Sequence, residues 1–98
     1  MPRHHIRTQR TINAIEEVIT ERRRQISLQD EGRFKFTLSD SGLSDSQRLV
    51  CIMEEVGEVA RNILTRDGLA KDGDTSDLDL RKELSQIAAL SVAWMERL

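Results

Sequence analysis

Apolar residues recur at steps of three and four along three stretches of the chain. This spacing places them on one face of an α-helix, which has about 3.6 residues per turn. In the first stretch Ile12, Ile15 and Ile19 carry the apolar stripe, and comparable stripes follow in the other two. The predicted helices cover approximately residues 7–25, 45–66 and 77–98.

The second predicted helix has clear end signals. Ser44 or Asp45 is a suitable N-cap, because a short polar side chain accepts a hydrogen bond from an unpaired amide of the first turn. Asp67-Gly68 is a common stop signal. The apolar stripe of this helix consists of Leu49, Ile52, Met53, Val56, Ala60, Ile63 and Leu64.

The third predicted helix opens with Ser76 or Asp77 as its N-cap. Ala88, Ala89 and Ala93 are small, so we expect another helix to approach closely along this part. The predicted buried side consists of Leu80, Leu84, Ile87, Ser91, Trp94, Met95 and Leu98.

Two polar stretches separate the helices. Residues 26–44 have no helical period, and Phe34 and Phe36 alternate there with polar residues as they would in a strand. A lone strand has no partner to pair with, so we predict an ordered loop whose phenylalanines pack down or face a pocket. Residues 67–77 form an acidic connector without periodicity.

Length and composition fit one helical domain covering residues 1–98. Aromatic residues make up only 3% of the chain and charged residues 33%, whereas sheets favour aromatic and β-branched residues. The apolar stripes are too extensive for three short helices to bury among themselves. We therefore expect an all-α fold whose three main helices complete a four-helix-type bundle through oligomerisation.

Charge and cysteine content limit the partners and the compartment. The net charge of −2 gives no general attraction to nucleic acid or to an anionic membrane. No apolar run approaches the ~20 residues that span a bilayer, and no signal-peptide pattern opens the chain. The single cysteine, Cys51, lies in an apolar stretch, where a buried small hydrophobic residue is a better interpretation than a nucleophile. We expect a soluble, cytoplasmic protein.

Acidic residues at helical spacing are the strongest chemical signal. Glu55 and Glu58 are three residues apart and therefore neighbours on one helix face, and Glu83 and Gln86 repeat this spacing on the third helix. If the two helices pack antiparallel, the four oxygen-bearing side chains converge into a site suited to Mg²⁺. Gly57 costs the second helix ~1 kcal/mol relative to alanine, which close approach of a helix or of a phosphate would explain.

The stretch Glu54-Glu55-Val56-Gly57-Glu58-Val59-Ala60-Arg61, followed by Lys82-Glu83-Leu84-Ser85-Gln86-Ile87-Ala88, resembles the MazG-like family of all-α nucleotide pyrophosphohydrolases. That family has Glu-x-x-Glu and, after a gap, Glu-x-x-Asp. The run Glu21-Arg22-Arg23-Arg24-Gln25 ahead of an irregular segment also resembles small single-domain members. This chain has Gln86 where the family has aspartate, which removes one negative charge from the site.

The resemblance implies hydrolysis of (deoxy)nucleoside triphosphates to the monophosphate and pyrophosphate, with a house-cleaning role. It implies Mg²⁺, or Mn²⁺ as a substitute, held by Glu55, Glu58, Glu83 and Gln86. Glu54 would orient the attacking water, or would instead pair at the surface with Arg61 or Arg48. The expected catalytic residues are Glu54, Glu55, Glu58 and Glu83.

Substrate contacts are expected from residues beside the acidic pairs and from the irregular segment. Arg61 and Lys82 would steady phosphates, and Phe34, Phe36 or Trp94 would stack on the base, although each aromatic residue also suits the core. The family resemblance further implies a homodimer or a dimer-of-dimers tetramer.

Two alternatives remain at this point. The chain could be a non-catalytic helical dimerisation or regulatory module that lost activity through Gln86, with arginines of the first helix meeting a partner. It could also be a phosphoribosyl-ATP pyrophosphohydrolase, which resembles the same family in fold and chemistry.

Overall fold

The computed structural model of the protein describes residues 3–34, 37–76 and 78–98, and within them every regular element is an α-helix. Helix α1 covers Arg3–Asp30, α2 covers Asp45–Arg66 and α3 covers Leu80–Met95. The predicted all-α class with three helices is confirmed. No helix in the described part of the chain is long and apolar enough to cross a membrane.

Helix α1 is longer at both ends than the predicted 7–25. It continues through residues 26–30 because no glycine or proline interrupts them, and it ends where Gly32 adopts a left-handed backbone with φ of 75°. The amide of Arg33 then donates to the carbonyl of Leu28 over 2.8 Å, which closes the C-terminus. No stop signal is present at Gln25, so the predicted helix end at residue 25 is too early.

The predicted bounds of α2 are confirmed. Ser44 is the N-cap: its side chain accepts from the Gln47 amide over 3.1 Å, and the Gln47 side chain accepts from the Ser44 amide over 2.8 Å. This reciprocal pair is a capping box. At the other end Gly68 has a φ of 78°, so the chain leaves the helix where the Asp67-Gly68 signal predicts.

Helix α3 is shorter than the predicted 77–98, and its N-cap is Asp79 rather than Ser76 or Asp77. The Asp79 side chain accepts from the Lys82 amide over 3.2 Å. Ser76 instead donates from its amide and its hydroxyl to Asp74, which forms a local turn in the connector. Asp77 lies outside the described residues.

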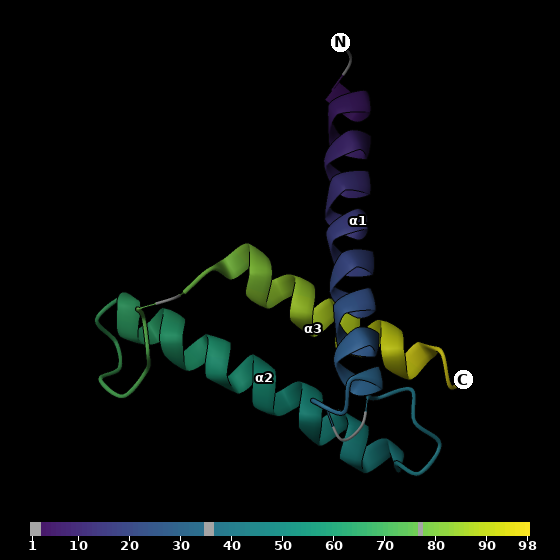
Figure 1. The fold of residues 1–98 in the computed structure, drawn as a ribbon. Helices are drawn as coiled ribbons and strands as arrows, with labels where there is room; N and C mark the ends of the chain where they lie inside the picture. The colour runs from purple at the N-terminus through teal and green to yellow at the C-terminus, as the bar shows by residue number, and fades with distance from the viewer. Residues whose placement is uncertain (1–2, 35–36, 77) are drawn as a thin grey trace.

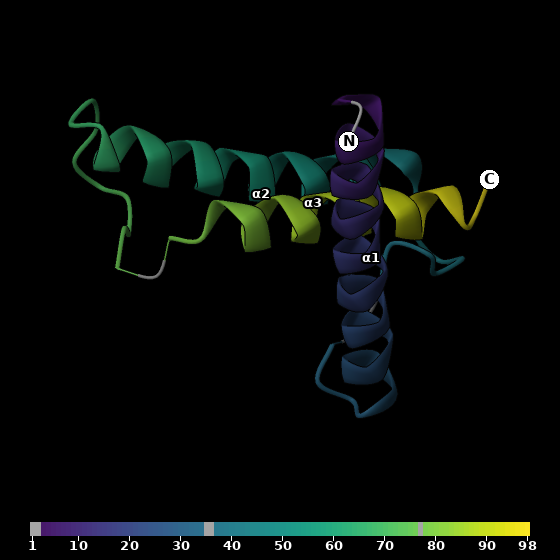
Figure 2. The same ribbon diagram turned by 90° about the horizontal axis from the view of Figure 1, so that it is seen from above.

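Helices α2 and α3 run antiparallel side by side, and α1 crosses them steeply (Figures 1 and 2). Helix α3 packs against both of the others, whereas α1 and α2 do not approach each other directly within the described residues. The C-terminal half of α1 lies over α3, and its N-terminal half extends away from the other helices. Arg81 joins Glu17 over 2.6 Å, and Arg22 joins Glu96 over 2.7 Å, so ion pairs fix α1 to both ends of α3.

The core is small and centred on α3. Ala89 and Ala93 are fully buried, with 0% of their surface exposed, which confirms that small residues on this helix allow close approach. Val59 on α2 and Leu38 in the loop are the other buried apolar residues in the described part of the chain.

Much of the predicted apolar surface is exposed in the single chain. On α3 the predicted buried side is wrong at Leu84, Met95 and Leu98, because the helix turns its alanine face inward. On the other two helices, the exposed large residues of the predicted stripes are Ile12, Ile15, Ile19, Leu49, Met53, Val56 and Leu64. The expectation that three helices alone do not cover these stripes therefore agrees with the exposure observed.

Candidate functional site

One cavity of about 370 Å³ lies where all three helices and the loop after α1 meet. Helix α1 supplies polar side chains to it, the loop and α2 supply apolar and acidic ones, and α3 supplies an amide. The lining residues are Glu21, Arg24, Gln25, Phe34, Thr37, Leu38, Cys51, Glu54, Glu55, Gln86 and Leu90. The cavity therefore has an acidic wall on α2, facing a polar wall on α1 and a mainly apolar loop.

Glu55 is the central residue of the acidic wall. The side of α2 that faces the rest of the protein contains four residues with low solvent exposure at steps of four, three and four. These residues are Arg48, Ile52, Glu55 and Val59. A carboxylate thus occupies a position on the packed face of the helix, where an apolar residue would be the default. Its presence there, at the edge of a cavity, calls for a chemical explanation.

Glu55 is affected by carboxylates of α2, which forms the acidic wall, and of its neighbour α3. Partial burial raises the pKa of Glu55, and the negative charges of Glu58, Glu83 and Glu54 raise it further. Glu83 is on α3, so the antiparallel packing of the two helices brings carboxylates of both within electrostatic reach. Repulsion among these groups favours the protonated form of Glu55 in the metal-free protein.

The four predicted ligands have unequal positions. Glu55 and Gln86 line the cavity, Glu83 is half-buried one turn before Gln86, and Glu58 is exposed. Within the described residues no three His, Cys, Asp or Glu side chains lie close enough together to hold a metal ion as they stand. The structure therefore brings the two helix faces together but leaves the carboxylates apart.

The α1 wall contains a bidentate ion pair between Arg24 and Glu21. Arg24 donates to both carboxylate oxygens of Glu21, over 2.8 and 2.7 Å, and this hydrogen bonding raises the pKa of Arg24. Glu21 is only 8% exposed, whereas half of the Arg24 side chain faces solvent. The neighbouring Gln25 is buried at 6% exposure, so its amide is positioned at the cavity wall.

Sequence reasoning did not anticipate this α1 wall. The spacing of Glu21 and Arg24, one helical turn apart, was available as a signal, but such pairs are common on exposed helix surfaces. Thr37 and Leu38 were not anticipated as cavity residues either, because the loop that completes the cavity has no periodic pattern. Cys51 on α2 and Leu90 on α3 were expected to be ordinary apolar packing residues, if anything, and not cavity residues. Cys51 is only half-buried, so the prediction of a buried residue at this position is wrong.

Of the predicted substrate contacts, Phe34 lines the cavity with 38% of its surface exposed. Phe36 lies outside the described residues. Trp94 does not line the cavity; it is half-buried, and its buried indole nitrogen has no acceptor in the described part of the chain.

The two predicted phosphate-binding cations lie elsewhere. Arg61 forms an exposed ion pair with Asp72 over 3.7 Å. Lys82 is exposed and borders a separate, open hollow between α1 and the start of α3. Arg61 and Arg48 each bond to groups other than Glu54, so neither of the surface pairings considered for Glu54 is observed.

Comparison of the chain with protein-family models, curated proteins and solved structures gives no match.

Proposed function

We propose that the protein is a magnesium-dependent pyrophosphohydrolase that cleaves nucleoside triphosphates to the monophosphate and pyrophosphate. The observation that carries the proposal is Glu55. This carboxylate lies on the packed face of α2, lines the cavity where the three helices meet the loop after α1, and is within electrostatic reach of Glu83 on α3. Such an arrangement costs stability unless a cation offsets the repulsion.

The residues present fit a hard divalent cation. Glu55, Glu58 and Glu83 provide carboxylate oxygens, Gln86 provides an amide oxygen, and Mg²⁺ prefers oxygen ligands while keeping several waters. Mn²⁺ accepts the same ligand types. The carboxylates, which repel one another in the metal-free chain, would turn toward a bound cation. When bound, the ion would neutralise phosphate charge and lower the pKa of a coordinated water.

The rest of the cavity suits a nucleoside. Phe34, Leu38 and Leu90 offer apolar surface to a base, while Gln25 and Thr37 place hydrogen-bonding groups at the wall. Arg24 lies at the solvent-exposed rim of the cavity. Its guanidinium can form a bidentate contact with a phosphate if the phosphate replaces Glu21 as its partner. Glu54, exposed beside Glu55 at the cavity wall, would orient the attacking water molecule.

A pyrophosphate-release screen tests the proposal. Canonical and modified ribo- and deoxyribonucleoside triphosphates, and phosphoribosyl-ATP, are incubated with the protein with and without Mg²⁺. Glu55→Gln should abolish release and leave the fold unchanged by circular dichroism. Glu31→Gln is the matched control, because Glu31 lies at the exposed turn after α1 and should have wild-type activity. Equal turnover in the wild type and in Glu55→Gln would overturn the assignment.

The exposed apolar stripes support a second part of the proposal, namely that the active protein is a homodimer or a dimer-of-dimers tetramer. Helix α1 exposes Ile12, Ile15 and Ile19 at 42%, 54% and 45%, and contiguous exposed apolar surface of this kind commonly marks an interface. Helices from a second copy would complete a four-helix-type bundle with α1.

The same stripes favour one alternative, a helical dimerisation or regulatory module without catalysis. In that case Gln86 would mark the loss of a metal ligand. The screen separates the two functions, because a module would assemble normally and show no pyrophosphate release from any nucleotide.

A further inference from the structure

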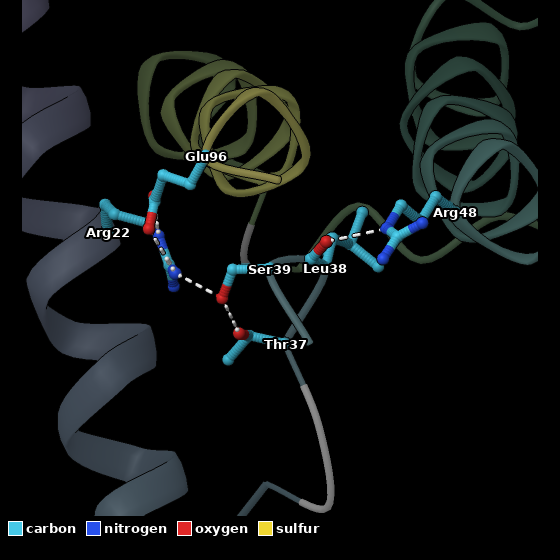
Figure 3. A network of polar contacts seen from close by, with 6 residues as sticks. All are labelled: Arg22, Thr37, Leu38, Ser39, Arg48 and Glu96. Atoms are coloured by element: carbon cyan, nitrogen blue, oxygen red, sulfur yellow. Dashed lines mark hydrogen bonds and ion pairs between the residues drawn. The ribbon is translucent and has the colours of Figure 1, made fainter. Parts of the chain in front are cut away.

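The loop that walls the cavity is held by two buried arginines on different helices (Figure 3). Residues 37–40 contain no regular element, yet Thr37 is 6% exposed and Leu38 only 2% exposed. Both line the cavity opposite the acidic wall of α2. Something other than secondary structure must therefore fix this segment.

Arg48 of α2 holds the loop through its backbone. Its Nε donates to the carbonyl of Leu38 over 2.8 Å, and its Nη2 donates to the carbonyl of Asp40 over 2.6 Å. The Arg48 residue is 5% exposed. A guanidinium with this geometry fixes the position of both carbonyls at once, because its donors are held in one plane.

Stability alone is a poor explanation for Arg48. Its nearest carboxylate partner, Asp45, lies 3.4 Å away with 76% of its side chain exposed, so a nearly buried charge is balanced mainly by neutral carbonyls. Burying a charge in this way costs free energy that a well-packed apolar side chain would not. What the guanidinium does provide is a fixed path for the loop.

Helix α1 holds the same loop from the opposite side. Arg22 is 6% exposed, and its Nη2 donates to the Ser39 hydroxyl over 2.9 Å while the guanidinium also pairs with Glu96. The hydroxyls of Ser39 and Thr37 are 2.7 Å apart, which continues the chain of contacts to the cavity wall. Figure 3 shows the loop passing between the two arginines.

We propose that Arg48 is a positioning residue for ligand binding: it fixes the carbonyls of Leu38 and Asp40 and thereby sets the wall that Thr37 and Leu38 present to the bound nucleotide. The proposal rests on the proposed function for its ligand, and on the hydrogen bonds of Arg48 for its mechanism. Arg48 itself does not line the cavity, so it acts only through the loop. The carboxylates of α2 and α3 keep their places when the loop moves.

The proposal predicts that changes at Arg48 alter KM but not kcat. Arg48→Met should raise KM about tenfold or more, the loss expected when one or two charge-assisted hydrogen bonds no longer fix the binding wall. The kcat should change little, because the acidic wall is intact. Arg48→Lys retains one donor to a carbonyl and should lie between the two. Arg66→Met is the matched control, since Arg66 forms an exposed ion pair with Asp67 at the far end of α2, and it should behave as wild type.

A second readout needs no activity. Cys51 is the single cysteine of the chain and lines the same cavity as Thr37 and Leu38. Releasing the loop should expose its thiol, so N-ethylmaleimide should alkylate Cys51 several-fold faster in Arg48→Met than in the wild type or Arg66→Met. If the wild type releases no pyrophosphate but this acceleration is seen, the proposed function fails while the loop-holding role of Arg48 stands.

Ser39→Ala extends the test if Arg48→Met does not fold. It removes the loop acceptor of Arg22 but leaves the Arg22–Glu96 pair in place, so no buried charge loses its carboxylate. We expect faster Cys51 alkylation and a raised KM in this variant too. Wild-type KM and wild-type alkylation in a folded Arg48→Met would overturn the proposal, and so would the same result in Arg48→Lys if Arg48→Met does not fold.

Discussion

At the scale of single residues, the position of Glu55 in the fold determines its protonation behaviour and its suitability as a metal ligand. Glutamates three residues apart occur on many exposed helix faces, where water screens their repulsion. Here the line of packed positions on α2 passes through Glu55, so it is partly removed from water and meets the field of Glu83 across the helix interface. Glu58, one turn further along the same helix, remains exposed.

Glu55 should make the stability of the metal-free protein depend on pH. Its pKa is raised in the folded chain, so the folded state binds the proton more tightly than the unfolded state. The free energy of unfolding should therefore fall as pH rises from the ordinary carboxyl range through the raised pKa. Thermal melts across this range should show the decline in the wild type and a flatter profile in Glu55→Gln.

Magnesium should reverse this decline. At a free concentration a hundred times its Kd, a bound ion adds about 2.7 kcal/mol, or roughly 10 °C or more for a domain of this size. The increase should be lost in Glu55→Gln and kept in Glu31→Gln. Equal shifts in both variants would mean that the ion acts elsewhere on the surface.

Glu96 has the opposite pH dependence. The hydrogen bond from Arg22 holds the pKa of Glu96 below its ordinary value. Its contribution to stability is therefore present above the ordinary carboxyl pKa and is lost as pH falls through the lowered pKa. Glu96→Gln leaves the buried Arg22 guanidinium without its carboxylate, and we expect a loss of about 2–3 kcal/mol at neutral pH by chemical denaturation. Glu31→Gln breaks only an exposed pair and should cost less than about 1 kcal/mol.

At the scale of elements, local signals determined what could be predicted. The bounds of α2 were predictable because Ser44, Gln47 and Gly68 act within a few residues of each helix end. The start of α3 was missed because Ser76 bonds to Asp74 and so is not available as a cap. Local sequence does not show which of several neighbouring polar residues becomes the cap.

The buried faces were harder to predict than the helices. Periodicity identified an apolar stripe on each helix, but tertiary packing selected the side of α3 with Ala89 and Ala93 and left Leu84 outside. The cavity was predictable on its acidic side and at Phe34 of the loop. Its α1 and loop walls depend on how Arg22 and Arg48 hold residues 37–40, which is a long-range arrangement without a sequence period.

The connector between α2 and α3 offers a test of close packing. A Cβ added at Gly73 would lie 2.5 Å from the Thr65 hydroxyl and 2.7 Å from the Arg61 carbonyl, because the Gly73 amide bonds to Thr65. Gly73→Ala should therefore destabilise the protein by about 1–3 kcal/mol in denaturant titrations. Gly42→Ala is the control, since no described atom would lie within 4 Å of its Cβ.

At the scale of the whole molecule, the exposed stripe of α1 should control assembly. Ile15→Glu places a charge between Ile12 and Ile19, on the exposed apolar stripe of α1. We expect gel filtration and light scattering to show a monomer for this variant and an oligomer for the wild type. Gln9→Glu adds the same charge at a polar, exposed position of α1 and should leave assembly unchanged. A stable, active wild-type monomer would contradict the oligomer.

The central place of α3 has a consequence for cooperativity. Because α1 and α2 each pack on α3 and not directly on one another in the described part of the chain, melting of α3 would leave them joined mainly through the loop of residues 37–40. The backbone amides around Ala89 and Ala93 should thus exchange with deuterium only on global opening, while those near the N-terminus of α1 exchange through local fraying. Slow exchange that survived at α1 or α2 after α3 had become labelled would reveal a second, independent folding unit.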